Sequence, residues 1–387
     1  MPPNCASDVA GDLEKQVFIL LKGESPSIHS VANPPFQAED NFQADMHNGR
    51  ITAICLRLEV TAKGSRPEQR ISTRWREMLD CAVYWLNLIV ETMEFSQQFP
   101  VVLVERIFMK LGISSYTYMW SIGFQGANPA FPNKAARPQH PLTPLGLLQK
   151  ARDLGVSLVQ TGPNLGLDQY PESEIESFIQ TAKAWGIALE LGTRGLDYDH
   201  LVRQVALAKR MDAMLIRTLP EIGGKYATDA RLIPPVVRQI LPILEQEGIQ
   251  LAIENGKNPA AELRAALDEL HSPHVGIVLD MVNSLAVPEG WKEVTQLLAP
   301  HAMCVHYKDF TIRRAWHMMG FICEGTPAGQ GLVETEWLLE TLKASPYDFN
   351  VIIELWPPEQ PNLEDAIALE QQWADKSVPY LRKYIKD

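Results

Sequence analysis

Four ionisable residues each follow a short apolar run, in a pattern that suits a metal site. Glu254 ends the run LAIE, Asp280 ends GIVLD, His306 lies in MCVHYKD, and Glu354 lies in VIIELW. Each run reads as a buried strand, and a charged group at its end requires a cation, a proton or several hydrogen bonds. Three carboxylates that converge would repel one another without a cation between them. Oxygen ligands with one histidine predict a single divalent ion, which is Mn, Mg, Co or Zn.

Each of these residues also has an ordinary structural explanation when it is considered alone. A carboxylate at the end of a strand is more often the partner of a salt bridge or a helix cap than a metal ligand. His306 alone is more often a hydrogen-bonded core histidine. The four residues follow four consecutive apolar runs at equivalent positions, however, and this joint pattern favours the metal site.

The elements that must position these residues begin near Met109. From there onward, short apolar runs alternate with helical patterns, and Gly155, Gly186 and Gly248 mark the ends of three of the helices. Eight such units predict an α/β fold, a closed (β/α)8 TIM barrel of ~250 residues. An open doubly wound sheet would instead need a glycine-rich phosphate loop, and residues 113–123 do not supply one. The predicted strands are 110–116, 156–161, 188–192, 213–218, 250–254, 275–280, 303–307 and 350–355.

Reactive groups of such a barrel lie at the carboxyl ends of its strands. Tyr116, Glu190, Arg217 and Lys308 lie at these ends and are predicted to contact the substrate. An arginine after the apolar run AMLI could hold a carboxylate with two hydrogen bonds. The alternative for Arg217 is an ion pair with Glu190 or Glu254.

The segment after the seventh predicted strand is unusual. Asp309 is expected to orient a metal ligand or Lys308. The connection 310–332 is long for a loop between a strand and a helix, and it contains four glycines. Loops of this length at the active face usually cover the site, so this one is predicted to do so. Its aromatic residues Trp316 and Phe321 could line the site, and plain packing is the alternative.

The first 108 residues differ from the rest of the chain. They hold three of the five cysteines and only weak mixed patterns, with no repeat, phosphate loop or metal-ligand spacing. The predicted domains are therefore an N-terminal extension, 1–108, and the barrel, 109–387. The favoured interpretation is that the extension is disordered or absent from the mature protein, and the alternative is a small accessory domain.

Composition narrows the classes of partner and compartment. The chain has 35 basic and 47 acidic residues and a formal net charge of -12, which disfavours nucleic acid and anionic membranes as partners. An odd number of cysteines without C-x-x-C spacing indicates neither a disulfide framework nor a thiolate zinc site. With no signal peptide or membrane anchor recognised, we expect a cytoplasmic protein. Homo-oligomerisation is left open.

Several segments resemble the sugar isomerase and epimerase superfamily, whose members have a xylose-isomerase-like TIM barrel. The resemblance covers residues 109–387 and is carried by AIEN, GIVLDMVNS, VHYKDF and GQGLVETEWLLETL. It implies one divalent metal ion bound by Glu254, Asp280, His306 and Glu354. It also implies that the two glutamates flank the substrate as catalytic acid and base. More narrowly, ISSYTY and the long 310–332 connection are similar to members that act as 3-oxo-isoapionate decarboxylases.

The resemblance implies a metal-dependent enzyme that acts on a small sugar or sugar acid through a metal-bound enediolate, as an isomerase or epimerase. The alternative is a decarboxylase of a 3-oxo sugar acid that yields a ketotetrose. Epimerases of the superfamily commonly have a histidine shortly after the strand-six aspartate, where this chain has Asn283. An amide can orient a substrate hydroxyl but cannot relay a proton. Distant alternatives are an abasic-site endonuclease, for which the second and third strand ends lack histidines, and a non-catalytic binder of sugar acids.

Overall fold

The computed structural model describes residues 15–25, 42–47, 50–60, 102–105, 109–123 and 138–386. The chain divides into two compact units, Met1–Ile107 and Phe108–Asp387. In the first unit, four strands pair in the order β2–β3–β1–β4, and every pair is antiparallel. The rest of the predicted extension lies outside the described residues, so its disorder or removal stays a prediction. The strands are β1 (Lys15–Ser25), β2 (Phe42–His47), β3 (Arg50–Val60) and β4 (Val102–Glu105).

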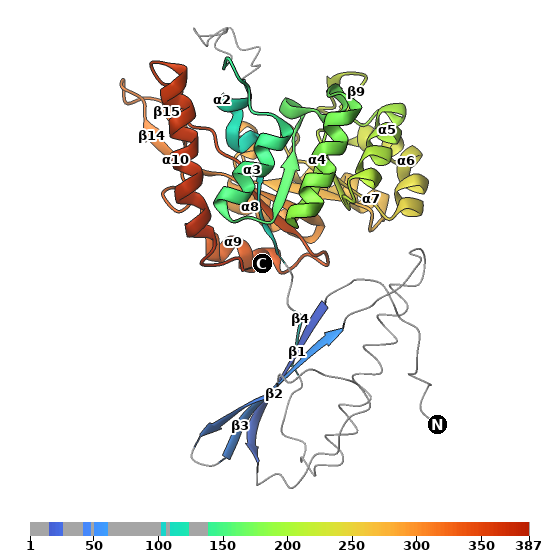
Figure 1. Cartoon of the computed structure of the whole chain (residues 1–387), viewed down its shortest axis with the longest axis vertical. Coiled ribbons are helices and arrows are strands. Elements are labelled where there is room, and N and C mark those ends of the chain that lie inside the picture. The colour runs from blue at the N-terminus through green and yellow to red at the C-terminus, as the bar shows by residue number, and fades with distance from the viewer. Residues whose placement is uncertain are drawn as a thin grey trace. The chain divides into compact units, whose positions relative to one another are not determined.

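The second unit is the predicted (β/α)8 barrel. Eight parallel strands close in the order β11–β12–β13–β16–β5–β6–β7–β8 (Figure 1). The ring closes where β16 pairs with β5, with Val351 beside Leu111 and Ile353 beside Ile113. The strands are β5 (Leu111–Ser114), β6 (Leu158–Thr161), β7 (Ala188–Gly192), β8 (Leu215–Thr218), β11 (Gln250–Glu254), β12 (Val275–Asp280), β13 (Ala302–Tyr307) and β16 (Asn350–Ile353).

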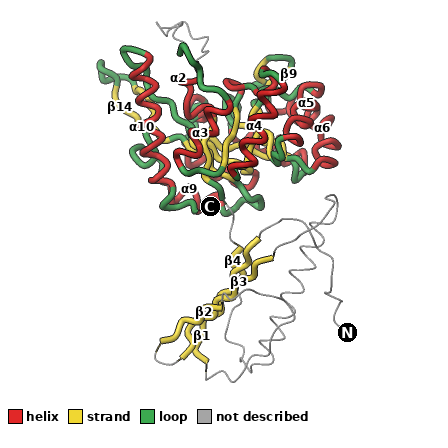
Figure 2. Tube along the Cα trace, viewed as in Figure 1, coloured by secondary structure: helices red, strands yellow, loops and turns green. Residues whose placement is uncertain are grey.

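Helices surround the strands on the outside of the barrel (Figure 2). The first of them, α3, begins where the sequence supplies a cap: Thr143 accepts a hydrogen bond from the backbone N–H of Gly146, and Pro144 is the first residue of the helix. Left-handed glycines end α3, α4 and α6, as predicted. The outer helices are α3 (Pro144–Leu154), α4 (Glu172–Trp185), α5 (Tyr198–Arg210), α6 (Ile233–Glu247), α7 (Ala260–Leu270), α8 (Trp291–Leu298), α9 (Thr335–Leu342) and α10 (Leu363–Leu381).

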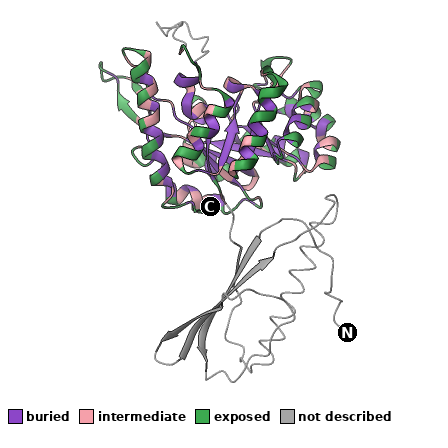
Figure 3. Cartoon of the chain, viewed as in Figure 1, coloured by how far each residue is buried: buried purple, intermediate pink, exposed green. Residues whose placement is uncertain are grey.

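The barrel strands are buried on both faces, whereas each helix buries one side (Figure 3). This explains why the strands read as continuous apolar runs rather than as alternating patterns. One cluster of buried side chains in the barrel comes from six of the strands and consists of Leu158, Leu215, Ala252, Val278, Met303, Cys304 and Ile352.

The first and eighth strands are shorter than predicted. Ser114 ends β5 because its side chain accepts a hydrogen bond from the backbone N–H of Tyr116 and begins a 3-10 turn, Ser115–Tyr118. A short helix, α2 (Met119–Ile122), follows. Strand β16 ends at Ile353, so Glu354 is the first residue beyond it.

The long connection predicted as a covering loop contains an antiparallel hairpin, β14 (Asp309–Arg314) and β15 (Phe321–Thr326). Trp316 is 91% exposed and Phe321 66% exposed, so in this structure neither side chain lines the site. Whether the segment covers the site stays a prediction. A smaller hairpin, β9 (Glu221–Ile222) and β10 (Lys225–Tyr226), follows β8. Within the described residues, no helix is long and apolar enough to cross a membrane.

Candidate metal centre

The four predicted ligands lie at the carboxyl ends of four neighbouring strands. Glu254 and Asp280 are the last residues of β11 and β12, His306 is the penultimate residue of β13, and Glu354 follows β16. Asp280 and His306 are direct neighbours in the parallel pairing of β12 with β13. All four side chains are buried. The closed barrel therefore brings residues that are far apart in the sequence to one point.

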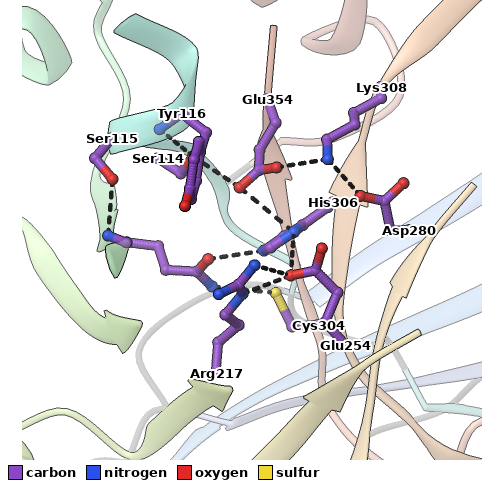
Figure 4. Close-up of polar contacts among 12 residues, drawn as sticks. Ser114, Ser115, Tyr116, Arg217, Glu254, Asp280, Cys304, His306, Lys308 and Glu354 are labelled. Carbon is purple, nitrogen blue, oxygen red and sulfur yellow. Dashed lines mark hydrogen bonds and ion pairs between the residues drawn. The ribbon is translucent and has the colours of Figure 1, made fainter. Parts of the chain in front are cut away.

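Their ligand atoms are close enough to share one ion. One oxygen each of Glu254 and Asp280 and one nitrogen of His306 lie within 4.8 Å of one another. Glu354 joins them, because its Oε1 lies 3.4 Å from Nδ1 of His306, and Oε2 of Glu254 lies 3.3 Å from the same nitrogen (Figure 4). Ligands about 2.0–2.2 Å from an ion are about 4 Å apart when they face each other across it. The spacing of these atoms fits a divalent ion.

The state of the His306 ring supports this fit. Its Nε2 lies 2.7 Å from Oε1 of Gln160, an oxygen that can only accept a hydrogen bond, so Nε2 carries a proton. Its Nδ1 is fully buried and has no aligned hydrogen-bond partner. In the neutral ring this leaves a lone pair on Nδ1 that points toward two carboxylates, which is an arrangement a cation would satisfy.

Two positively charged side chains partly compensate the carboxylates. Nζ of Lys308 lies 2.5 Å from Oδ2 of Asp280 and 2.9 Å from Oε2 of Glu354 (Figure 4). Arg217 forms an ion pair with Glu254 and donates to the backbone oxygen of Thr193 at 3.2 Å. Of the two partners considered for Arg217, the structure therefore shows the ion pair with Glu254. With all three carboxylates ionised and His306 neutral, the two cations leave one uncompensated negative charge at the site.

Burial and these charges oppose each other in setting the pKa values. Burial favours neutral Glu254, but Arg217 and His306 outweigh it and lower the pKa of this carboxyl. At Glu354 burial is likewise outweighed, by His306 and Lys308, and the pKa is lowered. At Asp280 burial prevails over Lys308 and raises the pKa. Burial opposes charge on His306, yet the two glutamates raise its pKa.

Besides Arg217, three residues predicted to contact substrate lie directly beside this cluster. Nδ2 of Asn283 donates to Oε1 of Glu254 at 2.7 Å. The ring of Tyr116 lies 6.0 Å from the guanidinium of Arg217. Lys308 bridges two of the four predicted ligands.

Glu190 does not lie with them. It is the third residue of β7, its side chain is buried, and its carboxylate accepts hydrogen bonds from Asn350 at 2.7 Å and from Gln160 at 2.9 Å. These partners belong to the barrel interior, and Gln160 in turn contacts His306. Glu190 was predicted as a substrate contact because it lies near a strand end. The structure shows it in contact with Gln160 and Asn350, and its role as a substrate contact stays a prediction.

Asp309 also differs from its predicted role. It accepts hydrogen bonds from the backbone N–H groups of Gly329, Gly331 and Val333 at 2.8, 3.0 and 3.1 Å. It therefore holds the segment after β15 rather than orienting Lys308 or a ligand.

Two residues beside the site were not predicted from the sequence. Gln160 contacts His306, and Ser114 donates to Oε1 of Glu354 at 3.0 Å. The one available signal was a polar residue inside or at the end of an apolar run, SLVQT and LGISS.

Comparison with known proteins agrees with this fold. Residues 119–377 match the family described as xylose isomerase-like TIM barrel. A 3-oxo-isoapionate decarboxylase from Pectobacterium atrosepticum is 31% identical over 274 residues, which are 70% of this chain and 95% of that protein.

Two solved structures show the same fold. A xylose isomerase domain protein from Planctomyces limnophilus has a TM-score of 0.50 at 17% identity, over 72% of this chain and 99% of the other. A D-psicose 3-epimerase determined in the presence of D-fructose has a TM-score of 0.50 at 16% identity, over 72% and 99%. From the matched family and the shared barrel, this chain belongs to the xylose isomerase-like TIM barrel family.

Proposed function

We propose that this protein is a divalent-metal-dependent enzyme that acts on a small sugar or sugar acid at the carbon next to a carbonyl group. The observation that carries the proposal is the convergence of Glu254, Asp280, His306 and Glu354, with the buried Nδ1 of His306 directed at the glutamates. Three acceptor-only carboxylates around one lone pair form a site for a cation.

The chain's own residues supply the remaining chemistry. A divalent ion held by this cluster would act as a Lewis acid and stabilise the negative charge that develops on a substrate oxygen. Glu254 and Glu354 are the two carboxylates placed to remove a proton from a carbon and to return it. Lys308 and Arg217 keep these glutamates ionised, because each cation lowers the pKa of the glutamate with which it pairs. Asn283 holds Oε1 of Glu254 in place.

Decarboxylation of a 3-oxo sugar acid is a second candidate, and the decarboxylase relative that aligns over 95% of its length favours it. In that reaction the bond between the carboxylate and its neighbouring carbon breaks, CO2 leaves, and the electron pair remains on the substrate until a proton is returned to the carbon. Asn283 also favours it, since an amide cannot relay the proton that a simple epimerisation exchanges.

The test measures metal content and product together. Purified protein is dialysed with Mn²⁺ or Mg²⁺, analysed for bound metal, and supplied with ketoses and with 3-oxo sugar acids, and both isomers and CO2 are measured. We expect a bound divalent ion and turnover of one substrate class. His306→Ala should lose both while its far-ultraviolet circular dichroism is unchanged. Wild-type levels of metal in His306→Ala would remove His306 from the ligand set.

The choice between the two reactions is made with the same preparation. Release of CO2 from a 3-oxo acid faster than in buffer with the same metal supports the decarboxylase. Exchange of substrate hydrogen with solvent deuterium without CO2 release supports an isomerase or epimerase that uses Glu254 and Glu354. If the protein binds metal but turns over neither class of substrate, the remaining candidate is a non-catalytic protein that binds sugar acids.

A further inference from the structure

We infer that Gln160 and Glu190 are positioning residues that determine which nitrogen of His306 carries the proton. They do so through a chain of hydrogen bonds in which the ionised form of Glu190 fixes each donor and acceptor. The inference rests on the proposed role of His306 as a metal ligand, and it extends that role to the interior of the barrel.

The chain of hydrogen bonds begins at the backbone. The N–H of Lys110, just before β5, donates to Oδ1 of Asn350 at 3.1 Å. A backbone N–H can only donate, so the amide of Asn350 must present its oxygen to Lys110 and its nitrogen elsewhere. That nitrogen, Nδ2, donates to Oε1 of Glu190 at 2.7 Å.

Glu190 determines which atom of the Gln160 amide faces it. Burial raises the pKa of Glu190 and opposes its ionisation, whereas the hydrogen bonds from Asn350 and Gln160 lower the pKa. The ionised carboxylate only accepts hydrogen bonds, so this form requires Gln160 to turn its Nε2 toward Oε2 of Glu190, and the two atoms are 2.9 Å apart. The oxygen of the same amide then faces His306, with Oε1 2.7 Å from Nε2 of the ring. Nε2 of His306 must therefore carry the proton.

The consequence appears at the opposite nitrogen of the ring. With the proton on Nε2, the neutral imidazole has its lone pair on Nδ1, between Glu254 and Glu354. The side chains of Gln160, Glu190 and His306 are all buried, so solvent does not readily replace a missing partner. The other tautomer would place an N–H where a cation must bind.

One isosteric substitution should reverse the direction of the hydrogen bond between Gln160 and His306. In Glu190→Gln, the new amide must offer its oxygen to Asn350, whose orientation Lys110 fixes, and its NH2 group to Gln160. Gln160 must then rotate its amide and direct NH2 at His306, which moves the ring proton to Nδ1. Adding Gln160→Glu should correct this, because a carboxylate at position 160 accepts from both neighbours.

The experiment measures the tautomer and the metal affinity separately. Histidine ring ¹⁵N chemical shifts are recorded for the metal-free full chain at alkaline pH, where the ring is neutral, and His306 is assigned by the signal that His306→Gln lacks. Mn²⁺ affinity is measured by equilibrium dialysis. We expect the Nε2–H tautomer in the wild type, the Nδ1–H tautomer with about 10- to 100-fold weaker Mn²⁺ binding in Glu190→Gln, and recovery of both in the double variant.

The control is Glu370→Gln, which makes the same change at another buried carboxylate, on the outer helix α10. It should leave the His306 tautomer and Mn²⁺ affinity unchanged. The inference is overturned if the wild-type ring carries its proton on Nδ1, or if Glu190→Gln retains Nε2–H and wild-type affinity. Wild-type protein with Nε2–H that binds no Mn²⁺ would support the chain of hydrogen bonds and contradict the proposed metal function.

Discussion

Arg217 illustrates how a single residue can stabilise a site through its charge. Its guanidinium pairs with Glu254 in a region that water does not reach, since both side chains are at most 5% exposed. Removal of one partner of a buried ion pair leaves the other charge uncompensated, which typically costs 3–5 kcal/mol. A bound cation would replace much of the missing positive charge.

Arg217→Met is therefore expected to lower the free energy of unfolding of the metal-free protein by about 3–5 kcal/mol, and to lose much less in saturating Mn²⁺. Urea unfolding with and without the metal measures both values. Arg194→Met is the control, because Arg194 is 54% exposed and its pair with Glu221 spans 3.5 Å, so its loss should stay within about 0.5 kcal/mol. An equal loss for Arg217→Met with and without Mn²⁺ would contradict the prediction.

For single residues, the sequence predicts the charged side chains of the site better than it predicts the uncharged residues that hydrogen-bond to them. Glu254 and Asp280 are recognisable because a charge at the end of a buried strand is costly and requires a reason. Gln160 carries no charge, and nothing in its neighbourhood along the chain indicates that it meets Glu190 and His306. Gln160 lies beside Glu190 in the parallel pairing of β6 with β7, and it reaches His306 on β13, which is not adjacent to β6 in the closed ring.

Helix α10 is fastened to the start of α2 by one buried carboxylate. Glu370 accepts hydrogen bonds from the backbone N–H groups of Trp120 at 2.8 Å and of Ser121 at 2.7 Å, and from the Ser121 hydroxyl. Burial nevertheless raises its pKa from 4.5 to about 7. The folded protein thus holds this proton in a pH range where the unfolded chain has released it.

This shift predicts how stability depends on pH. Between pH 4.5 and about 7 the native state binds more protons at Glu370 than the unfolded state does, so the contribution of this group to stability is greatest below pH 4.5 and is lost as pH rises through 7. The full effect is on the order of 3 kcal/mol. Glu370→Gln should remove this part of the pH dependence, as measured by urea unfolding across the range.

The same substitution at the exposed Glu364 of α10 should leave the pH dependence as in the wild type. A Glu370→Gln variant that follows the wild-type curve would show that the carboxyl titrates equally in both states.

Helices and strands were predicted well where a pattern in a short stretch of sequence identifies them. The eight barrel strands and their helices follow from apolar runs, glycine ends and helical patterns. The hairpin β14–β15 was not predicted, because its two strands mix polar with apolar residues, and beyond Phe310 most of their residues are exposed or only partly buried. The shortening of β5 depends on the Ser114 cap, which no propensity scale resolves.

For the whole molecule, the boundary near Met109 leads to a direct test. All eight strands of the closed ring lie after residue 108, so we expect a chain of residues 109–387 to unfold cooperatively and to bind Mn²⁺ as the full chain does. Calorimetry and equilibrium dialysis measure these properties. A chain that begins at residue 119 lacks β5 and should not form the ring. Aggregation of 109–387, with recovery when 1–108 is added, would instead show that the first unit is needed.

The pairing of β16 with β5, which closes the barrel, also predicts the order of folding and metal binding. It joins residues 240 positions apart at the contact of Lys110 with Asn350, and closing so long a loop costs about 5 kcal/mol of chain entropy. Contacts of such separation form late and slowly. The hydrogen bonds that orient His306 begin at this contact, so a refolding chain should gain tryptophan fluorescence before it can bind Mn²⁺ tightly. Interrupted refolding, with metal added after increasing delays, should show tight binding only in the slowest phase. Newly made protein would then acquire its metal last, when the ring is already shut.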